Sequence, residues 1–290
     1  MIYLFLSILC SSAIFILFKG FEQYRVNTFT AIVINYLVAG LTGLTVIEEV
    51  VSVNEILHFS WSMNALFLGL VFIALFNLMA ITAQKFGASV ASIANKMALI
   101  IPVAFAIVHY NDTVTALKIV GIVLALLGVY LSTLKEKVDH GKKLNWKLII
   151  IPLLLFLGSG FIDTFLKFNQ EYHLEGKPFE AKLFSSLTFF TAGTIGLLVL
   201  LLDKSKRKFN RNTIVGGLIL GVINYGSIYF LIQIFDHSTL ESSVVFPINN
   251  MGVVIVTVLS SFLLFKEQFS LLNKIGVLVS LLAIVLISLA

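Results

Sequence analysis

Ten long runs of apolar residues follow one another along the chain, and no other feature limits the possible folds as strongly. The runs cover residues 2–18, 28–47, 63–84, 91–108, 116–134, 147–168, 182–202, 213–235, 242–264 and 271–289. A helix that crosses a bilayer needs about 20 such residues. Because backbone groups inside lipid must find hydrogen-bond partners within the protein, runs this long and uniform predict helices rather than the alternating strands of a barrel.

Composition agrees with a lipid environment. Hydrophobic residues make up 59% of the 290 residues and charged residues only 12%, whereas a soluble domain carries about a quarter charged residues. The first run has no positive residue before it and no cleavage pattern, so we interpret it as a retained span rather than a signal peptide. We therefore expect an all-α polytopic protein of the cell (plasma or inner) membrane, with the lipid bilayer around it.

The positive charges lie in the loops. The net charge is +5, but Lys and Arg are concentrated between apolar runs, which indicates topology signals and argues against nucleic acid as a partner. The basic loops follow the odd-numbered runs, and the loop after the second run carries Glu48, Glu49 and Glu55 instead. By the positive-inside rule this pattern predicts that both termini lie outside the cell.

The two halves of the chain share features in the same order. Segment 11–24 is similar to 159–172, Ala94–Met97 to Ile248–Met251, and Gly121, Ala125 and Gly128 match Gly276, Ser280 and Ala283. This duplication predicts a first repeat at 1–135, a basic linker at 136–146 and a second repeat at 147–290. Since each repeat holds five predicted helices, the second is inverted relative to the first. Many secondary transporters have this architecture, with a solute site where the halves meet near the midplane.

Each half ends in a small-residue-rich helix with a proline, an acidic residue in a short loop, and a helix that opens with a glycine. The residues are Ala88-Ser89-Val90-Ala91-Ser92, Pro102, Asp112 and Lys118-Ile119-Val120-Gly121 in the first half, and Glu241-Ser242-Ser243, Pro247, Glu267 and Lys274-Ile275-Gly276 in the second. This pattern resembles the EamA-like family of the drug/metabolite transporter superfamily, and the resemblance covers essentially the whole chain.

The resemblance implies a ten-helix carrier of small metabolites. The expected function is that of a secondary transporter, an exporter or exchanger of a small polar metabolite that works by alternating access without a cofactor. Proton coupling is a further hypothesis. Members of the family generally keep both termini in the cytoplasm, which is opposite to the orientation that the charges predict, so the orientation stays open.

Two charged residues inside the apolar runs stand out, because a charge near the centre of a span costs about 3 kcal/mol on insertion scales and is expected to face protein or water. Lys96 lies beside Asn95, and Asp163 lies at a depth similar to that of Asn249 and Asn250. We therefore predict two polar patches on either side of a central cavity. Lys96 would attract an anionic group, unless its long stem carries the ammonium to the interface. Asp163 would bind an amine or a coupling proton, unless it is a hydrogen-bonded structural carboxylate.

Other residues inside the runs are weaker candidates. Asn77, Asn224 and Tyr225 could line the cavity, although such side chains more often join helices by hydrogen bonds. Pro102 and Pro247 are expected to bend their helices. The faces that contain Gly121, Gly128 and Gly276 predict close helix packing, either within the chain or at the seam of a homodimer.

Two other classes of protein are alternatives to a transporter. A membrane-embedded enzyme is disfavoured because the five histidines lie in or beside loops and form no His-x-x-x-His pair, and because no nucleophile motif or phosphate-binding loop occurs. We expect neither a metal nor catalytic residues. A membrane scaffold or receptor subunit stays open, although polar groups inside the spans argue mildly against it.

Overall fold

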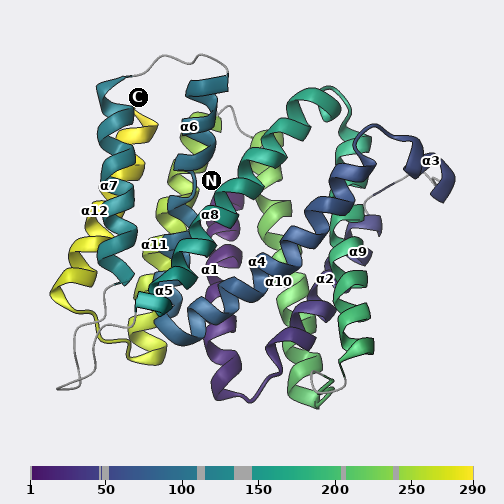
Figure 1. Cartoon of the computed structure of the whole chain (residues 1–290), viewed down its shortest axis with the longest axis horizontal. Coiled ribbons are helices and arrows are strands. Elements are labelled where there is room, and N and C mark those ends of the chain that lie inside the picture. Colours follow the sequence, from purple (N-terminus) through teal and green to yellow (C-terminus); the bar gives the residue numbers. More distant parts are fainter. Residues whose placement is uncertain are drawn as a thin grey trace. The chain divides into compact units, whose positions relative to one another are not determined.

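The structure is a computed structural model, which describes residues 2–45, 47, 52–109, 115–133, 146–203, 207–237 and 242–289. Every regular element in this part of the chain is helical (Figure 1). The elements are α1 (Ile2–Gln23), α2 (Thr28–Thr45), α3 (Val53–His58), α4 (Ser62–Phe86), α5 (Ala88–Met97), α6 (Ile100–His109), α7 (Ala116–Thr133), α8 (Trp146–Asn169), the π-helical turn η1 (Gln170–Leu174), α9 (Pro178–Leu202), α10 (Arg211–His237), α11 (Ser242–Phe265) and α12 (Leu271–Ser288). The prediction of an all-helical fold is confirmed for these residues.

Eight helical stretches are long and apolar enough to cross a membrane, and α5 with the first part of α6 forms one of them, over Ala88–Phe105. Helices α7 and α12 are apolar as well, over Ala116–Ser132 and Leu271–Ile287, but they are shorter. The helices are those of a multi-pass membrane protein. Ten complete spans stay a prediction.

The fourth apolar run is divided into α5 and α6, and Pro102 explains the break. Proline has no N–H to donate, and its ring clashes with the carbonyl four residues earlier, which here belongs to Ala98. That carbonyl instead accepts a hydrogen bond from the N–H of Ile101 at 2.9 Å. The expected bend at Pro102 is therefore confirmed, whereas α11, which contains Pro247, is one helix over Ser242–Phe265.

The short helix α3 was not expected. It begins at a capping box, in which the Ser52 side chain accepts from the Glu55 N–H and the Glu55 carboxylate accepts from the Ser52 N–H. A serine three residues before a glutamate is a known signal for a helix start. The pattern was therefore present in the sequence, in the loop after the second apolar run.

The chain packs into two compact units that are not the two repeats. Unit 1 comprises residues 1–19, 78–161 and 227–290, and unit 2 comprises residues 20–77 and 162–226. Each unit takes segments from both halves of the chain, and the boundaries fall inside α1, α4, α8 and α10. The units are described separately below.

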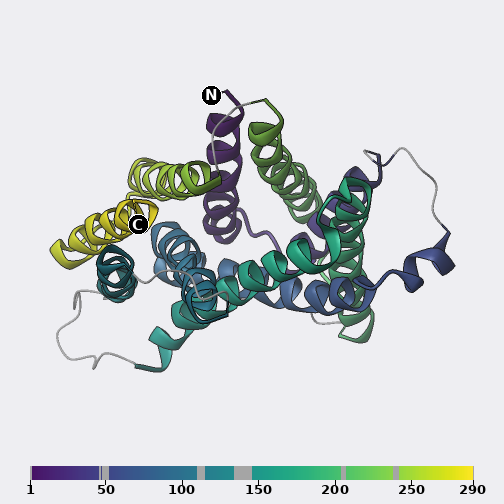
Figure 2. The ribbon, with the colours of Figure 1, turned by 90° about the horizontal axis from the view of Figure 1, so that it is seen from above.

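In unit 1, the last helices of the two halves, α7 and α12, lie side by side (Figures 1 and 2). A β-carbon at Gly276 would lie 2.5 Å from the backbone nitrogen of Ser132, and one at Gly121 would lie 2.6 Å from the Ile287 side chain. Gly128 faces Ser280 in the same way. Residue numbers thus rise along α12 as they fall along α7, so the two helices are antiparallel, as an inverted repeat requires.

The three glycines therefore pack helices within one chain, and the prediction of close packing is confirmed. A homodimer seam stays a prediction. Because Gly121, Gly128 and Gly276 are covered by the opposite helix of their own chain, such a seam would have to use other residues of α7 and α12.

Unit 2 contains the second helices of the two halves, α2 and α9, which are also antiparallel (Figure 1). A β-carbon at Gly40 would lie 3.1 Å from the Phe190 ring, and one at Gly43 would lie 2.5 Å from the Ser186 hydroxyl. Equivalent helices of the duplicated sequence therefore pair with each other in both units.

In unit 2, the third helix of each half packs on the second helix of the other half. Helix α10 packs on α2, where a β-carbon at Gly217 would lie 2.9 Å from the carbonyl oxygen of Ala31. Helix α4 packs on α9, where one at Gly69 would lie 2.8 Å from the carbonyl oxygen of Thr188. Each half thus supplies a glycine that lets the third helix approach the backbone of the other half's second helix.

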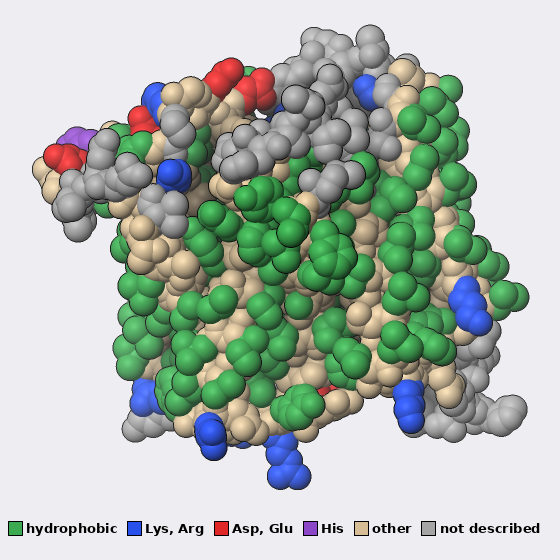
Figure 3. Space-filling model, turned by 180° about the vertical axis from the view of Figure 1, so that it is seen from behind, with side chains coloured by type: hydrophobic (Ala, Val, Ile, Leu, Met, Phe, Trp, Pro, Cys, Tyr) green, Lys and Arg blue, Asp and Glu red, His purple; other side chains and the backbone are tan. Residues whose placement is uncertain are grey.

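The surface has the character of a lipid-facing surface. Large apolar side chains are exposed over the helices, among them Leu202 at 86% and Met63 at 75%. In Figure 3, hydrophobic side chains are the most widespread of those coloured by type, and the Lys and Arg side chains lie mainly near the edges of the view. Soluble monomers rarely expose large continuous apolar patches, so this face supports a bilayer environment.

Candidate functional site

The predicted residues Asn95, Lys96, Asn249 and Asn250 all belong to unit 1, on α5 and α11, which pack against each other. Asn95 joins α5 to α8, since its Nδ2 donates to the Ser159 hydroxyl at 2.8 Å. Lys96, the next residue, is partly buried. The expected patch of Asn95 with Lys96 therefore lies at a contact between the two halves.

A carboxylate from the second half holds the start of α5. The Glu267 carboxylate accepts from the Ala88 N–H at 3.0 Å and from the Ser89 hydroxyl at 3.0 Å. A β-carbon at Gly87 would lie 2.8 Å from both oxygens of that carboxylate, and Gly87 has a φ of 109°, a left-handed conformation that favours glycine. The negative charge suits the N-terminus of α5 because free N–H groups and the helix dipole both favour an anion there.

Asn249 on α11 is the repeat counterpart of Asn95, and its surroundings differ. It is 3% exposed, and its Oδ1 has no hydrogen-bond partner among the residues that the structure describes. The neighbouring contacts join α11 to α1: Ile8 covers Gly252, and the Ser12 hydroxyl donates to the Val253 carbonyl at 3.3 Å. Asn250, the next residue, is partly buried. The site thus contains one satisfied and one unsatisfied amide at equivalent positions.

Asp163 lies on the part of α8 that belongs to unit 2, where its side chain is exposed. The patch that combines Asp163 with Asn249 and Asn250 therefore draws on residues of two separate units and stays a prediction.

The remaining candidates lie in unit 2 and form hydrogen bonds between or within helices. The side-chain amides of Asn224 on α10 and Asn35 on α2 are hydrogen-bonded at 3.1 Å. Asn77 donates from Nδ2 to the Ile73 carbonyl of its own helix at 2.8 Å. Tyr225, beside Asn224, is partly buried. In the structure Asn224 is part of a helix-joining pair, the alternative role that its residue type suggested.

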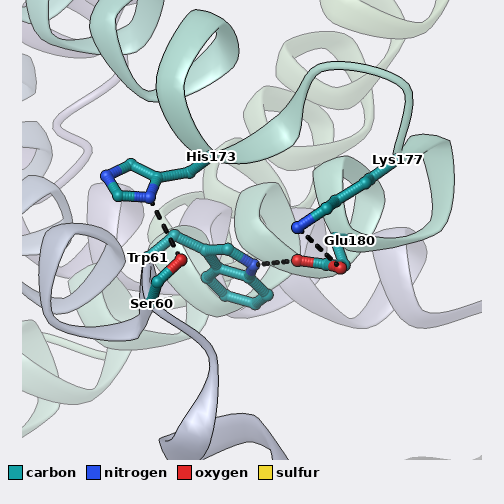
Figure 4. A network of polar contacts seen from close by, with 5 residues as sticks. All are labelled: Ser60, Trp61, His173, Lys177 and Glu180. Carbon is teal, nitrogen blue, oxygen red and sulfur yellow. Dashed lines mark hydrogen bonds and ion pairs between the residues drawn. The ribbon is translucent and has the colours of Figure 1, made fainter.

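Sequence reasoning did not single out a polar network at one end of unit 2. The fully buried indole of Trp61 donates from Nε1 to Glu180 Oε2 at 2.7 Å, and Lys177 Nζ lies 3.4 Å from Glu180 Oε1 (Figure 4). Beside it, the Ser60 hydroxyl and His173 Nδ1 are 3.1 Å apart. The network joins the segment before α4 to η1 and the start of α9. No local pattern could reveal its long-range contacts, because Trp61 and Glu180 are 119 residues apart and Ser60 and His173 are 113 residues apart.

The described residues contain no group of three or more His, Cys, Asp or Glu side chains that could hold a metal ion. On α5 and α11, the polar side chains of the candidate site are the amides of Asn95, Asn249 and Asn250 and the ammonium of Lys96. Such groups can bind a polar solute through hydrogen bonds and charge.

Comparison with known proteins assigns the fold to a family. The family model described as the EamA-like transporter family matches residues 1–134 and again residues 146–289. The chain belongs to the EamA-like transporter family. The predicted resemblance is confirmed, and the members of this family are membrane transporters of the drug/metabolite type rather than enzymes.

Two individual matches accompany this family. An uncharacterized protein from Haemophilus influenzae (strain ATCC 51907 / DSM 11121 / KW20 / Rd) is 28% identical over 286 residues, which cover 97% of this chain and 95% of that protein. A protein crystal structure is similar with a TM-score of 0.60 at 12% identity, covering 98% of this chain and 96% of that one. At this identity the second match shows the fold alone.

Proposed function

We propose that this EamA-like protein is a secondary transporter of the cell membrane, an exporter or exchanger that moves a small polar metabolite by alternating access. The observation that carries the proposal is the antiparallel pairing of equivalent helices from the two halves, α7 with α12 and α2 with α9. Carriers with inverted repeats bind their solute between the halves and open alternately to the two sides.

The proposed solute site is formed by Asn95 and Lys96 on α5 with Asn249 and Asn250 on α11. Two observations support it. These polar residues lie on helices whose other residues are mostly apolar, and the buried Oδ1 of Asn249 is an acceptor without a partner in the described residues. A buried acceptor of this kind is destabilising unless a donor reaches it. A solute with an N–H or O–H group could supply the donor.

The experiment that tests transport uses purified protein in two steps. A thermal-shift screen against amino acids, sugar phosphates and nucleotides identifies solutes that stabilise the fold. Counterflow of the stabilising solutes is then measured in proteoliposomes. Flux that depends on the protein supports the carrier. Stabilisation by a solute without any flux would contradict it and favour a receptor subunit, and conversion of a solute into a product would favour an enzyme.

The role proposed for Lys96 is attraction of an anionic group on the solute. Lys96→Ala should then weaken transport of anionic solutes while neutral solutes are affected little, and Lys96→Arg should preserve much of the preference. The matched control is Lys118→Ala, which removes a lysine from the start of α7. An equal loss for anionic and neutral solutes would show that Lys96 only anchors its helix at the interface.

Coupling to protons through Asp163 is a separate part of the proposal. Asp163→Asn keeps the size of the side chain but removes its titration. It should abolish the dependence of transport on a pH gradient while solute counterflow continues. An unchanged dependence on the gradient would remove Asp163 from the coupling mechanism.

A further inference from the structure

The duplicated sequence builds the same interface twice in unit 1, and the two copies are packed differently. In one copy, α5 meets α8 through the hydrogen bond from Asn95 to Ser159 at 2.8 Å. In the other copy, α11 meets α1. Asn249 and Ser11 stand where the first copy has Asn95 and Ser159, yet their bond is absent from the described contacts.

Other contacts hold the second copy together. The Ser12 hydroxyl donates to the Val253 carbonyl at 3.3 Å, and Ile8 covers Gly252. At the position of Ser12, the first copy has Gly160, which has no hydroxyl and packs against Ile101. One interface is thus held by the Asn–Ser bond and the other by a serine-to-backbone bond, although the sequences that form them are related.

Because the bond between Asn249 and Ser11 is absent from the described contacts, a polar atom of Asn249 is buried without a partner there. Asn249 is 3% exposed, and its Oδ1 has no partner among the described residues. Buried amide oxygens in proteins are nearly always hydrogen-bonded, and those that are not call for an explanation. An oxygen that gains its partner in another conformation would be such an explanation.

We propose that Asn249 and Ser11 form, in the opposite state of the transport cycle, the hydrogen bond that Asn95 and Ser159 form in this structure. This inference rests on the proposed alternating access. In carriers with inverted repeats, alternating access is largely a movement of one repeat or bundle against the other, and we take the two end states here to be those in which the related halves exchange their conformations. The Asn95–Ser159 bond therefore opens as the Asn249–Ser11 bond closes. Ser11 and Ser159 are positioning residues, since each acts through the helix that it holds.

The contacts give the size of the movement. Leu4 lies with Val245 in one apolar cluster, and Ser12 bonds to Val253, so α1 and α11 run parallel. Ser12 is level with Val253, hence Ser11 is about three residues, or ~4.5 Å, from the level of Asn249 at 1.5 Å per residue. A shift of roughly one helical turn would align them, which is a known type of step between two packed states.

The test is cross-linking in proteoliposomes without any solute. Cys10→Ser removes the native cysteine, and Ser11→Cys with Asn249→Cys provides one reporter pair for a short bifunctional thiol reagent. The pair should cross-link. Adding Ser159→Ala should accelerate cross-linking about five-fold, the factor that corresponds to the loss of one neutral hydrogen bond from the competing state.

The matched control is Ser92→Ala. Ser92 is also a buried serine of α5, three residues before Asn95, but its hydroxyl donates to the Ser89 carbonyl of its own helix at 2.9 Å, so the cross-linking rate should not change. If Ser11→Cys/Asn249→Cys does not fold, the reciprocal protein is used. With Asn95→Cys and Ser159→Cys as the pair, Ser11→Ala should increase the cross-linked fraction.

Absence of cross-linking in a folded Ser11→Cys/Asn249→Cys protein would overturn the proposal, as would an equal effect of Ser159→Ala and Ser92→Ala. Because these readouts require no solute, they are independent of the counterflow assay. A protein that exchanges the two bonds but moves no solute would contradict the proposed transport and leave the exchange standing. Transport without the exchange would contradict the present inference alone.

Discussion

The contact between α7 and α12 predicts a large effect for a very small substitution, Gly276→Ala. The added methyl group would lie 2.5 Å from the backbone nitrogen of Ser132 and 3.0 Å from its Cα and from the carbonyl carbon of Leu131. Ordinary contacts of a β-carbon begin at 3.4 Å. Because the neighbours are backbone atoms, no side-chain rotation can make room, and α12 would have to move by about 0.9 Å from α7.

That movement would disturb a second interaction. Asn273, one turn before Gly276, donates from Nδ2 to the carbonyls of Leu131 at 3.2 Å and Ser132 at 2.9 Å. Overpacking of a close contact typically costs about 1–3 kcal/mol, whereas Gly→Ala inside a helix contributes about 0.5–1 kcal/mol in the favourable direction. We therefore expect a net loss of about 1–2 kcal/mol. At about 2–4 °C per kcal/mol, the unfolding midpoint in detergent should fall by roughly 2–8 °C.

Gly216→Ala is the matched control because Gly216 is also the sixth residue of its helix, α10. A β-carbon there would meet only side-chain atoms, at 3.2 Å in Phe21 and 3.4 Å in Val26. Its midpoint should stay the same or rise, as the helix preference of alanine predicts. Thermal unfolding followed by tryptophan fluorescence measures both variants. A Gly276→Ala protein as stable as Gly216→Ala would refute the close approach of α7 and α12.

Two further predictions concern hydrogen bonds between helices. Glu267→Ala removes the carboxylate that caps α5 and should lower the free energy of unfolding by about 1.5–3 kcal/mol, as expected for hydrogen bonds to a charged group. Ser89→Ala should lower it by less, because the bond from Ala88 to Glu267 remains. Equal unfolding midpoints for Glu267→Ala and wild type would contradict this cap. For the Asn35–Asn224 pair, each single alanine variant should lower the free energy of unfolding by about 0.6–1.7 kcal/mol. The double variant should lower it by clearly less than the sum of the two, which a double-mutant cycle of unfolding midpoints measures. Simple additivity would show that the amides do not interact.

The sequence predicted the helices well because apolar runs of span length have few other solutions in lipid. Predicted and observed bounds agree to within a few residues for most helices, and the break in the fourth run occurs where Pro102 removes a backbone donor. The short helix α3 was missed because its capping box lies outside any apolar run. Local pattern therefore accounts for nearly all of the secondary structure of the described residues.

The contacts between helices were harder to predict than the helices themselves. The glycines of α7 and α12 indicated close packing, but a face of small residues does not specify whether its partner is in the same chain or in a second one. Asn95 and Asn249 look equivalent in sequence, and only the packing distinguishes the bonded amide from the unbonded one. The link from Trp61 to Glu180 depends on the full tertiary arrangement of unit 2, which no local spacing encodes.

The two kinds of contact between the halves suggest where a carrier of this fold would move. At α7–α12 and at α10–α2 the helices pack so closely that a β-carbon added at Gly276 or Gly217 would lie less than 3 Å from a backbone atom of the neighbouring helix. Packed surfaces of this kind do not deform gradually, so these pairs should travel as rigid bodies. At α5–α8 and α1–α11 the contacts include one hydrogen bond each, from Asn95 and from Ser12. A bond of about 1 kcal/mol can be exchanged for its equivalent at little net cost, and such an exchange lets two states of similar free energy alternate.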